Sequence, residues 1–164
     1  MTLLITPEEI FSRTPLRSNV DATKLKPYIE DMQYKYLNSL LGATLTRKII
    51  SDFESDSLVD SYAVVFGLMK SILIYATVGE YILFNQYQLT NAGVYKFTSD
   101  SGENVTSNEA EALAKRYKSK ADIYISELER YLCSTLANLP EYSVQDNNFD
   151  KRPSRKVEGS GWSF

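Results

Sequence analysis

The sequence predicts an all-α fold of about five helices, with two long central helices, a projecting loop or β-hairpin, and an extended C-terminal arm. Three observations predict it. Apolar residues recur three or four positions apart, capping signals precede these stretches, and only one short stretch has the period of two that marks a strand. The chain has 164 residues, 43% hydrophobic, which suits one helical domain over residues 1–142 and an arm over residues 143–164.

The first helix is predicted by its N-terminal capping signal. Thr6 suits the N-cap, Pro7 the first helical position, and Glu9 the position from which a carboxylate reaches back to the cap. A short helix should therefore run from Pro7 to about Ser12.

Two further helices should follow. Asp21 and Thr23 offer N-caps for the first of them, in which Pro27 must lie within the first turn. Its apolar stripe should contain Leu25, Ile29, Met32, Tyr36 and Leu40. Gly42 suits the end of this helix, and Thr44 then opens a short helix whose apolar face contains Leu45, Ile49 and Phe53.

The next helix should run from Leu58 to about Tyr87, either as one helix or as two joined by a bend near Gly67. It is apolar nearly all round, which is typical of a central helix covered by its neighbours. Lys70 and Glu80 are ten residues apart and cannot pair along this helix. Each should meet an opposite charge on another element or extend to the surface.

Residues 62–84 are also long enough to cross a bilayer, which takes about 20 apolar residues. Lys70 near the centre of such a span would cost about 2.5 to 3.5 kcal/mol, so a buried helix of a soluble protein is favoured. A helical membrane-associated protein is the alternative. Residues 1–10 lack the basic and long apolar regions of a secretory signal, and synthesis in a reducing cytosol is expected.

The last third of the domain contains a strand-like stretch and a long helix. Residues 94–98 alternate with period two before a polar run, which predicts a projecting loop or β-hairpin over residues 94–105. Thr106 and Glu109 form a second capping box that opens a helix to about Asn138. Its apolar side should contain Leu113, Tyr117, Ala121, Tyr124, Leu128, Tyr131 and Leu132. From residue 143 no periodic apolar pattern remains, which predicts an extended or disordered arm.

Composition excludes most familiar catalytic chemistry. The chain has no histidine and one cysteine, Cys133, so a Ser-His-Asp triad, a Cys-His pair, a His-ligated metal and an intrachain disulfide are all excluded. Cys133 is expected to be a small buried apolar residue. We therefore predict no enzyme activity, no catalytic or metal site, and no cofactor; an enzyme built on carboxylates, tyrosine and lysine alone stays open as an alternative without positive support.

A basic run over residues 115–120 contains Lys115, Arg116, Lys118 and Lys120 around Tyr117. Acidic residues flank it, so an ion-paired helix face is favoured. The alternative is a soluble helical regulator that binds nucleic acid through this run. The net charge of −3 argues against nucleic-acid binding as the main role of the chain.

Aromatic residues outside the predicted core indicate docking surfaces. Tyr95 and Phe97 lie in the predicted loop, and Trp162 and Phe164 lie in the predicted arm, where no core is available to cover them. The arm also carries four basic residues that could meet an acidic partner surface or DNA: Lys151, Arg152, Arg155 and Lys156.

Four blocks of the sequence resemble a known family. They are LITPEEIF, NVDATKLKPYIEDMQYKYLNSLLG, the apolar helix that ends in YQLTNAGVYKF, and ISELERYLCSTLANLPEY. Together they resemble the helical head-to-tail connector (head-completion or adaptor) proteins of tailed bacteriophages, most closely those of crAss-like phages and Bacteroidetes prophages. The resemblance covers residues 3–142. The chain departs from the family pattern in lacking a proline in the central helix and in ending with Trp-Ser-Phe.

The resemblance implies a structural role without catalysis. It implies a cyclic homo-oligomer of about twelve copies in the virion neck, below the portal protein and in contact with adjacent neck or tail proteins. Genomic DNA would pass through the channel without sequence-specific binding, no membrane would be involved, and the protein would be made in the cytoplasm of the host bacterium. The implied interaction surfaces are the projecting loop at residues 94–105 and the arm at residues 143–164.

Overall fold

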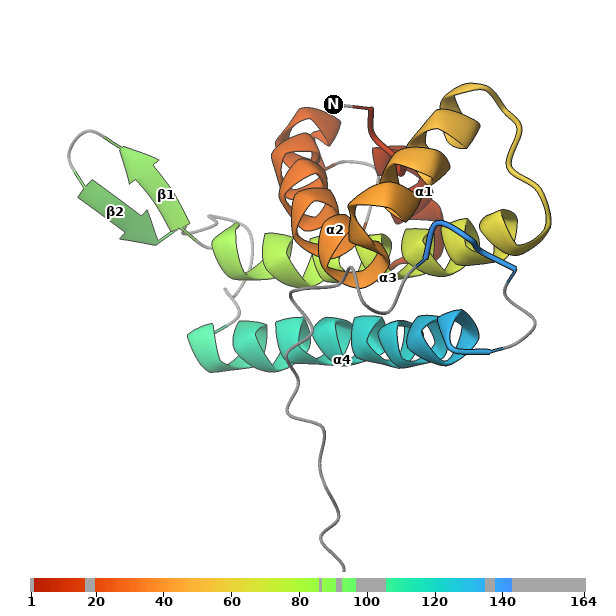
Figure 1. Ribbon diagram of the computed structural model, residues 1–164. Coiled ribbons are helices and arrows are strands. Elements are labelled where there is room, and N and C mark those ends of the chain that lie inside the picture. The colour runs from red at the N-terminus through yellow and green to blue at the C-terminus, as the bar shows by residue number, and fades with distance from the viewer. Residues whose placement is uncertain are drawn as a thin grey trace, which may run out of the picture.

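The computed structural model describes residues 2–16, 20–85, 87–90, 93–96, 106–134 and 138–142, with only the backbone described for the two strands. Its elements are the helices α1 (Pro7–Arg13), α2 (Ala22–Glu54), α3 (Asp60–Phe84) and α4 (Ser107–Leu132), with the strands β1 (Tyr87–Thr90) and β2 (Gly93–Lys96) between α3 and α4. The body of the protein is helical, as the sequence predicts (Figure 1).

Both predicted capping boxes are confirmed. At the start of α1, the Thr6 hydroxyl accepts from the Glu9 N–H, and the Glu9 carboxylate accepts from the Thr6 N–H at 3.0 Å. Thr106 and Glu109 make the same exchange at the start of α4. These contacts are between residues three apart, which is why the sequence alone could predict them.

The prediction of five helices is wrong for the described residues, which form four. The two helices expected on either side of Gly42 form one kinked helix, α2, in which Gly42 has φ 75° and ψ 162°. Only glycine adopts this conformation readily, so the chain turns here without a linker (Figure 1). The Thr46 hydroxyl donates to the Leu37 carbonyl across the kink at 3.2 Å. Pro27 lies in the second turn rather than the first, because Asp21 caps the helix.

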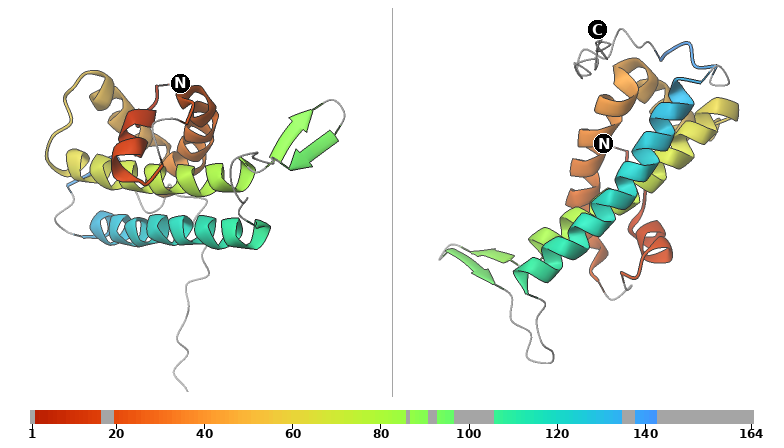
Figure 2. Two further views of the ribbon diagram at one scale, coloured as in Figure 1. Left: turned by 180° about the vertical axis from the view of Figure 1, so that it is seen from behind. Right: turned by 90° about the horizontal axis from the view of Figure 1, so that it is seen from below.

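The α3 and α4 helices run antiparallel side by side, and α2 and α1 pack on α3 (Figure 2). Of the two alternatives predicted for the central helix, the structure has the single helix: α3 runs from Asp60 to Phe84 without a break at Gly67. The two helices approach closely at Gly79. A Cβ added there would lie 3.2 Å from the Ala114 carbonyl oxygen, so glycine permits the contact. Side chains from α1, α2, α3 and α4 share one core.

Two predicted apolar stripes are partly wrong. In α4, Leu113 is 43% exposed, because Ala110 and Ala114 take the core positions at the close approach to α3. In α2, Leu25, Ile29 and Met32 are buried as predicted, but Tyr36 and Leu40 are only half-buried. The residues that take their place in the core are Gln33, Leu37 and Leu41.

Buried Gln33 fastens the N-terminal segment to α2. Its side-chain oxygen accepts from the Leu4 N–H at 2.9 Å, and its side-chain nitrogen donates to the Thr2 carbonyl at 2.7 Å. Leu4 and Ile5 are buried beside it. The buried amide is therefore satisfied by backbone groups about thirty residues away in the chain.

The strands pair differently from the predicted hairpin. β1 and β2 are antiparallel, with Gln88 opposite Tyr95 and Leu89 opposite Val94. The residues from Val94 onward thus pair with the preceding segment, and α3 ends at Phe84 rather than near Tyr87. The remainder of the expected loop, residues 97–105, lies outside the described residues, as does the arm at residues 143–164.

Candidate interaction surfaces

The residues predicted to dock onto a partner lie mostly outside the described part of the chain. Tyr95 is in β2, opposite Gln88, where only the backbone is described. The others lie outside the described residues altogether: Phe97, Lys151, Arg152, Arg155, Lys156, Trp162 and Phe164. Their role as a docking set therefore stays a prediction.

The structure adds a surface on α4 that the sequence analysis did not single out. Leu113, Arg116, Lys120 and Ile123 are spaced by three, four and three residues, which places them on one face of a helix with about 3.6 residues per turn. All four are exposed, and the exposed fractions of Leu113 and Ile123 are 43% and 65%. We call these four residues the α4 outer face. Among the described helices, only α3 packs extensively along α4, and the residues of α4 that are buried are others: Ala110, Ala114, Ala121, Leu128 and Leu132.

An aromatic cluster holds one charge of this face in place. Tyr75 of α3 stacks on Tyr124 of α4, with ring centroids 5.7 Å apart, and lies 6.4 Å from the ring of Tyr117. The ammonium group of Lys120 lies 5.3 Å from the Tyr75 ring centroid and 5.6 Å from that of Tyr117. Burial, reinforced by neighbouring Tyr75, raises the pKa of the Tyr117 hydroxyl. The lysine charge is thus positioned by two neutral rings.

The two charges predicted to need partners in the central helix both have them. Lys70 of α3 pairs with Glu9 of α1, and Glu80 of α3 pairs with Lys118 of α4 at 3.0 Å. This prediction is confirmed. The basic run over residues 115–120 is predicted to form an ion-paired helix face, and this prediction is only partly right. Lys118 pairs with Glu80 of α3 and not with a residue of its own helix. Within the described part of the chain, Lys115 and Arg116 have no ion-pair partner.

An acidic surface lies at the connection between α2 and α3. We define the acidic end as Glu54, Asp56, Val59, Asp60 and Val64, all exposed, with Val59 at 59% and Val64 at 45%. No lysine or arginine occurs between residues 54 and 64. This connection lies at the end of the helical body opposite to the strands (Figure 1).

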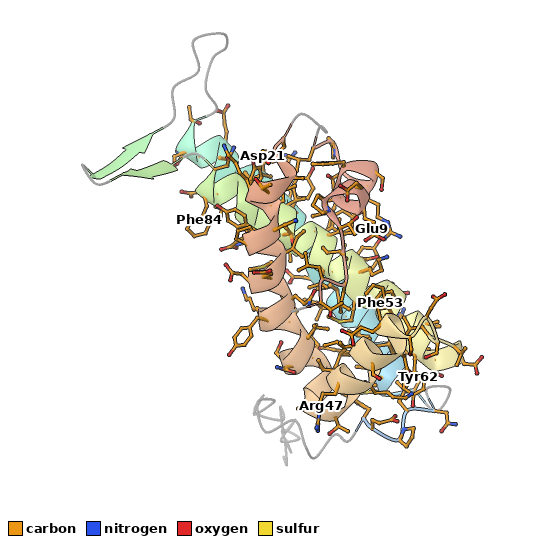
Figure 3. The ribbon with its side chains drawn as sticks, turned by 90° about the horizontal axis from the view of Figure 1, so that it is seen from above. Glu9, Asp21, Arg47, Phe53, Tyr62 and Phe84 are labelled. Atoms are coloured by element: carbon orange, nitrogen blue, oxygen red, sulfur yellow. The ribbon has the colours of Figure 1, made fainter. Side chains whose placement is uncertain are left out.

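A hydrogen bond joins the start of α3 to the chain after α4. The Tyr62 hydroxyl donates to the Glu141 carboxylate at 2.5 Å, which raises the pKa of Tyr62 to about 12. Figure 3 shows Tyr62 and Phe53 near one end of the helical body and Phe84 near the other. The Phe53 and Phe66 rings pack with centroids 5.1 Å apart and join α2 to α3.

The described side chains contain no group of three or more His, Cys, Asp or Glu residues that could hold a metal ion. Cys133 is exposed, which corrects the prediction that it is buried. It is the C-cap of α4, directly after Leu132, the last residue of that helix.

One described helix, α3, is long and apolar enough to cross a membrane. It packs against α1, α2 and α4, and its two charged residues beyond the first turn are ion-paired to α1 and α4. This is the environment of a core helix.

Most of the helical domain matches a protein family. Residues 22–152 match a family of unknown function, DUF6712. The chain belongs to this family. The DUF6712 match begins at the first residue of α2 and spans α3, both strands and α4, so the α4 outer face and the acidic end both lie within it. No curated protein and no solved structure matches the chain.

The α4 outer face could have been noticed in the sequence by its three-four-three spacing. The rotation of α4 about its axis was the missing information. Leu113 is predicted to be buried because the alanines that take its place in the core are only weakly apolar. The exposed stripe is therefore not predicted from the sequence. The acidic end is easier to recognise in the sequence, because no lysine or arginine occurs between residues 54 and 64, a stretch that contains Val59 and Val64.

Proposed function

We propose that this chain is a structural virion protein that forms a ring in the head-to-tail connector below the portal of a tailed phage. The ring extends the DNA channel and provides the platform to which the tail attaches. The proposal rests on the resemblance over residues 3–142 and on one structural observation, a pair of strands that projects from a helical body (Figure 2).

The projecting strands support an assembly role for a physical reason. β1 and β2 pair with each other over four residues each, beyond the end of the helices. An isolated two-stranded hairpin is marginally stable in water, and its two outer edges leave backbone groups available for another chain. A neighbouring subunit or the portal would supply the missing contacts.

The arm completes the proposal. Trp162 and Phe164 are its anchors in a partner pocket, and the basic residues at 151–156 meet an acidic partner surface or the channel DNA. The partners are further copies of the chain, the portal protein and adjacent neck or tail proteins. The role involves no catalysis, cofactor or membrane, and its location is the virion neck.

The test is size-exclusion chromatography with light scattering, without detergent. The chain is run alone and then with the portal ring from the same phage. We expect several copies to elute with the portal, and deletion of residues 143–164 to abolish this while the helical circular dichroism signal is retained. A chain that requires detergent, or that never elutes with the portal, would overturn the proposal. Steeply salt-dependent DNA binding by the free chain would favour the nucleic-acid-binding alternative.

A further inference from the structure

The α4 outer face combines a basic centre with apolar ends. Leu113 and Ile123 are ten residues apart, which corresponds to about 15 Å along a helix. Between them are Arg116 and Lys120. The Lys120 ammonium is held over two tyrosine rings, and Arg116 has no ion-pair partner among the described residues. In the next turn the Glu127 carboxylate pairs with the Arg130 guanidinium at 3.8 Å.

The acidic end has the complementary character. Three exposed carboxylates, those of Glu54, Asp56 and Asp60, lie among two exposed valines, Val59 and Val64. Asp56 and Asp60 both have positive φ, 51° and 48°, a conformation that aspartate and asparagine tolerate better than most residues. The acidic end thus combines negative charge with apolar side chains, whereas the α4 outer face combines positive charge with apolar side chains.

We infer that the α4 outer face of one copy binds the acidic end of a second copy. This inference deepens the proposed function and rests on it, because it names the surfaces through which neighbouring ring subunits meet. Opposite charges steer the two copies together, and the apolar residues at the margins are removed from water on contact.

The positions of the two surfaces make the contact head-to-tail. The acidic end is at the α2–α3 connection (Figure 1), whereas the outer face lies along α4. Two different patches of one chain therefore meet, and the growing assembly still presents one free patch of each kind, one at each of its two ends. Such a heterologous contact continues from copy to copy until a ring closes.

The chain offers a matched pair of substitutions on adjacent residues of α4. Arg116 lies on the outer face and Lys115 lies off it, and both are exposed without an ion-pair partner among the described residues. In sedimentation velocity at low ionic strength, Arg116→Glu should weaken self-association by about a hundredfold, because like charges then face each other. Lys115→Glu makes the same charge change and should leave self-association within about threefold of wild type.

A mixing experiment tests the head-to-tail geometry. The double variant Asp56→Asn, Asp60→Asn removes two of the three negative charges of the acidic end while keeping residues that tolerate positive φ, and Asp31→Asn on the exposed surface of α2 is its control. We expect this double variant and Arg116→Glu each to be monomeric alone. Mixed in equal amounts, they retain one intact pair of surfaces and should form dimers that grow no further.

Three results would overturn the inference: a wild-type chain that stays monomeric at millimolar concentration in low salt, equal effects of Arg116→Glu and Lys115→Glu, or a mixture that stays monomeric. Its failure is distinguishable from that of the proposed function. A chain that joins the portal but shows one of these results refutes only the contact between the two surfaces. A chain that self-associates through them but ignores the portal refutes the connector role.

Discussion

The two faces of α4 differ in residue type and in what covers them. The inner face buries Ala110, Ala114, Ala121 and Leu128 against α3, where Gly79 allows the backbones to approach closely. The outer face exposes Leu113 and Ile123 beside two basic residues, and no described helix covers it. One helix therefore contributes alanines and leucines to the core and also exposes two large apolar residues to solvent. The difference indicates that α4 is both a core helix and an interface helix.

The largest expected effect comes from one leucine on each face. Leu128 is fully buried, so Leu128→Ala should lower the free energy of unfolding by about 2–5 kcal/mol through lost burial and a residual cavity. Leu113→Ala should change it by no more than about 0.5 kcal/mol. Urea unfolding followed by circular dichroism measures both. Equal losses at the two positions would show that α4 is rotated differently about its axis.

Two glycines of α3 give a second matched pair. Gly79→Leu places a side chain against the Ala114 carbonyl oxygen and should destabilise the protein by about 1–3 kcal/mol. At Gly67 an added Cβ meets nothing within 4 Å, so Gly67→Leu should raise stability by about 0.5–1 kcal/mol through helix propensity. The pair is compared by thermal unfolding. If Gly79→Leu proved as stabilising as Gly67→Leu, the close approach of α3 and α4 would be refuted.

A smaller effect is expected where the chain after α4 returns to α3. Tyr62→Phe removes the hydrogen bond to Glu141 and should cost about 1 kcal/mol at neutral pH, less than for a buried bond because the pair is partly exposed. The pKa of Tyr62 is raised from 10.0 to about 12 in the folded protein. The stabilising contribution is therefore complete below about pH 10 and is lost as the pH rises towards 12.

Urea unfolding of the two proteins at neutral pH and at about pH 11 isolates this contribution. The difference in stability between wild type and Tyr62→Phe should shrink at the higher pH. Tyr34→Phe, on an exposed tyrosine of α2, is the control and should leave stability unchanged at neutral pH. A difference that stays constant with pH would contradict the hydrogen bond to Glu141.

Local features of this fold could be predicted from the sequence, and features set by the rotation of helices could not. Capping boxes depend on residues three apart, so Thr6 with Glu9 and Thr106 with Glu109 were predictable. The need of Lys70 and Glu80 for partners outside their own helix followed from their spacing, but the partners Glu9 and Lys118 required tertiary structure. Leu113 was misassigned because hydrophobicity alone cannot show that alanines occupy the tightest contact.

Other differences have the same origin. Gln33 is polar and was absent from the predicted stripe, but two backbone partners in the N-terminal segment make its burial favourable. The alternation of residues 94–98 predicts β2, whereas its partner β1 is not predicted, because the expected helix runs to about Tyr87, the first residue of β1. In both cases the structure depends on contacts with another segment of the chain, which local periodicity does not indicate.

The most direct test of the connector role is the number of chains bound per portal ring. Mass photometry of the portal ring, alone and after addition of excess chain, measures the mass gained. The account predicts a single saturated complex with one copy of the chain per portal subunit, the stoichiometry of a closed ring stacked on a ring. A portal ring whose mass stays unchanged, or that binds only one or two copies at saturation, would contradict it.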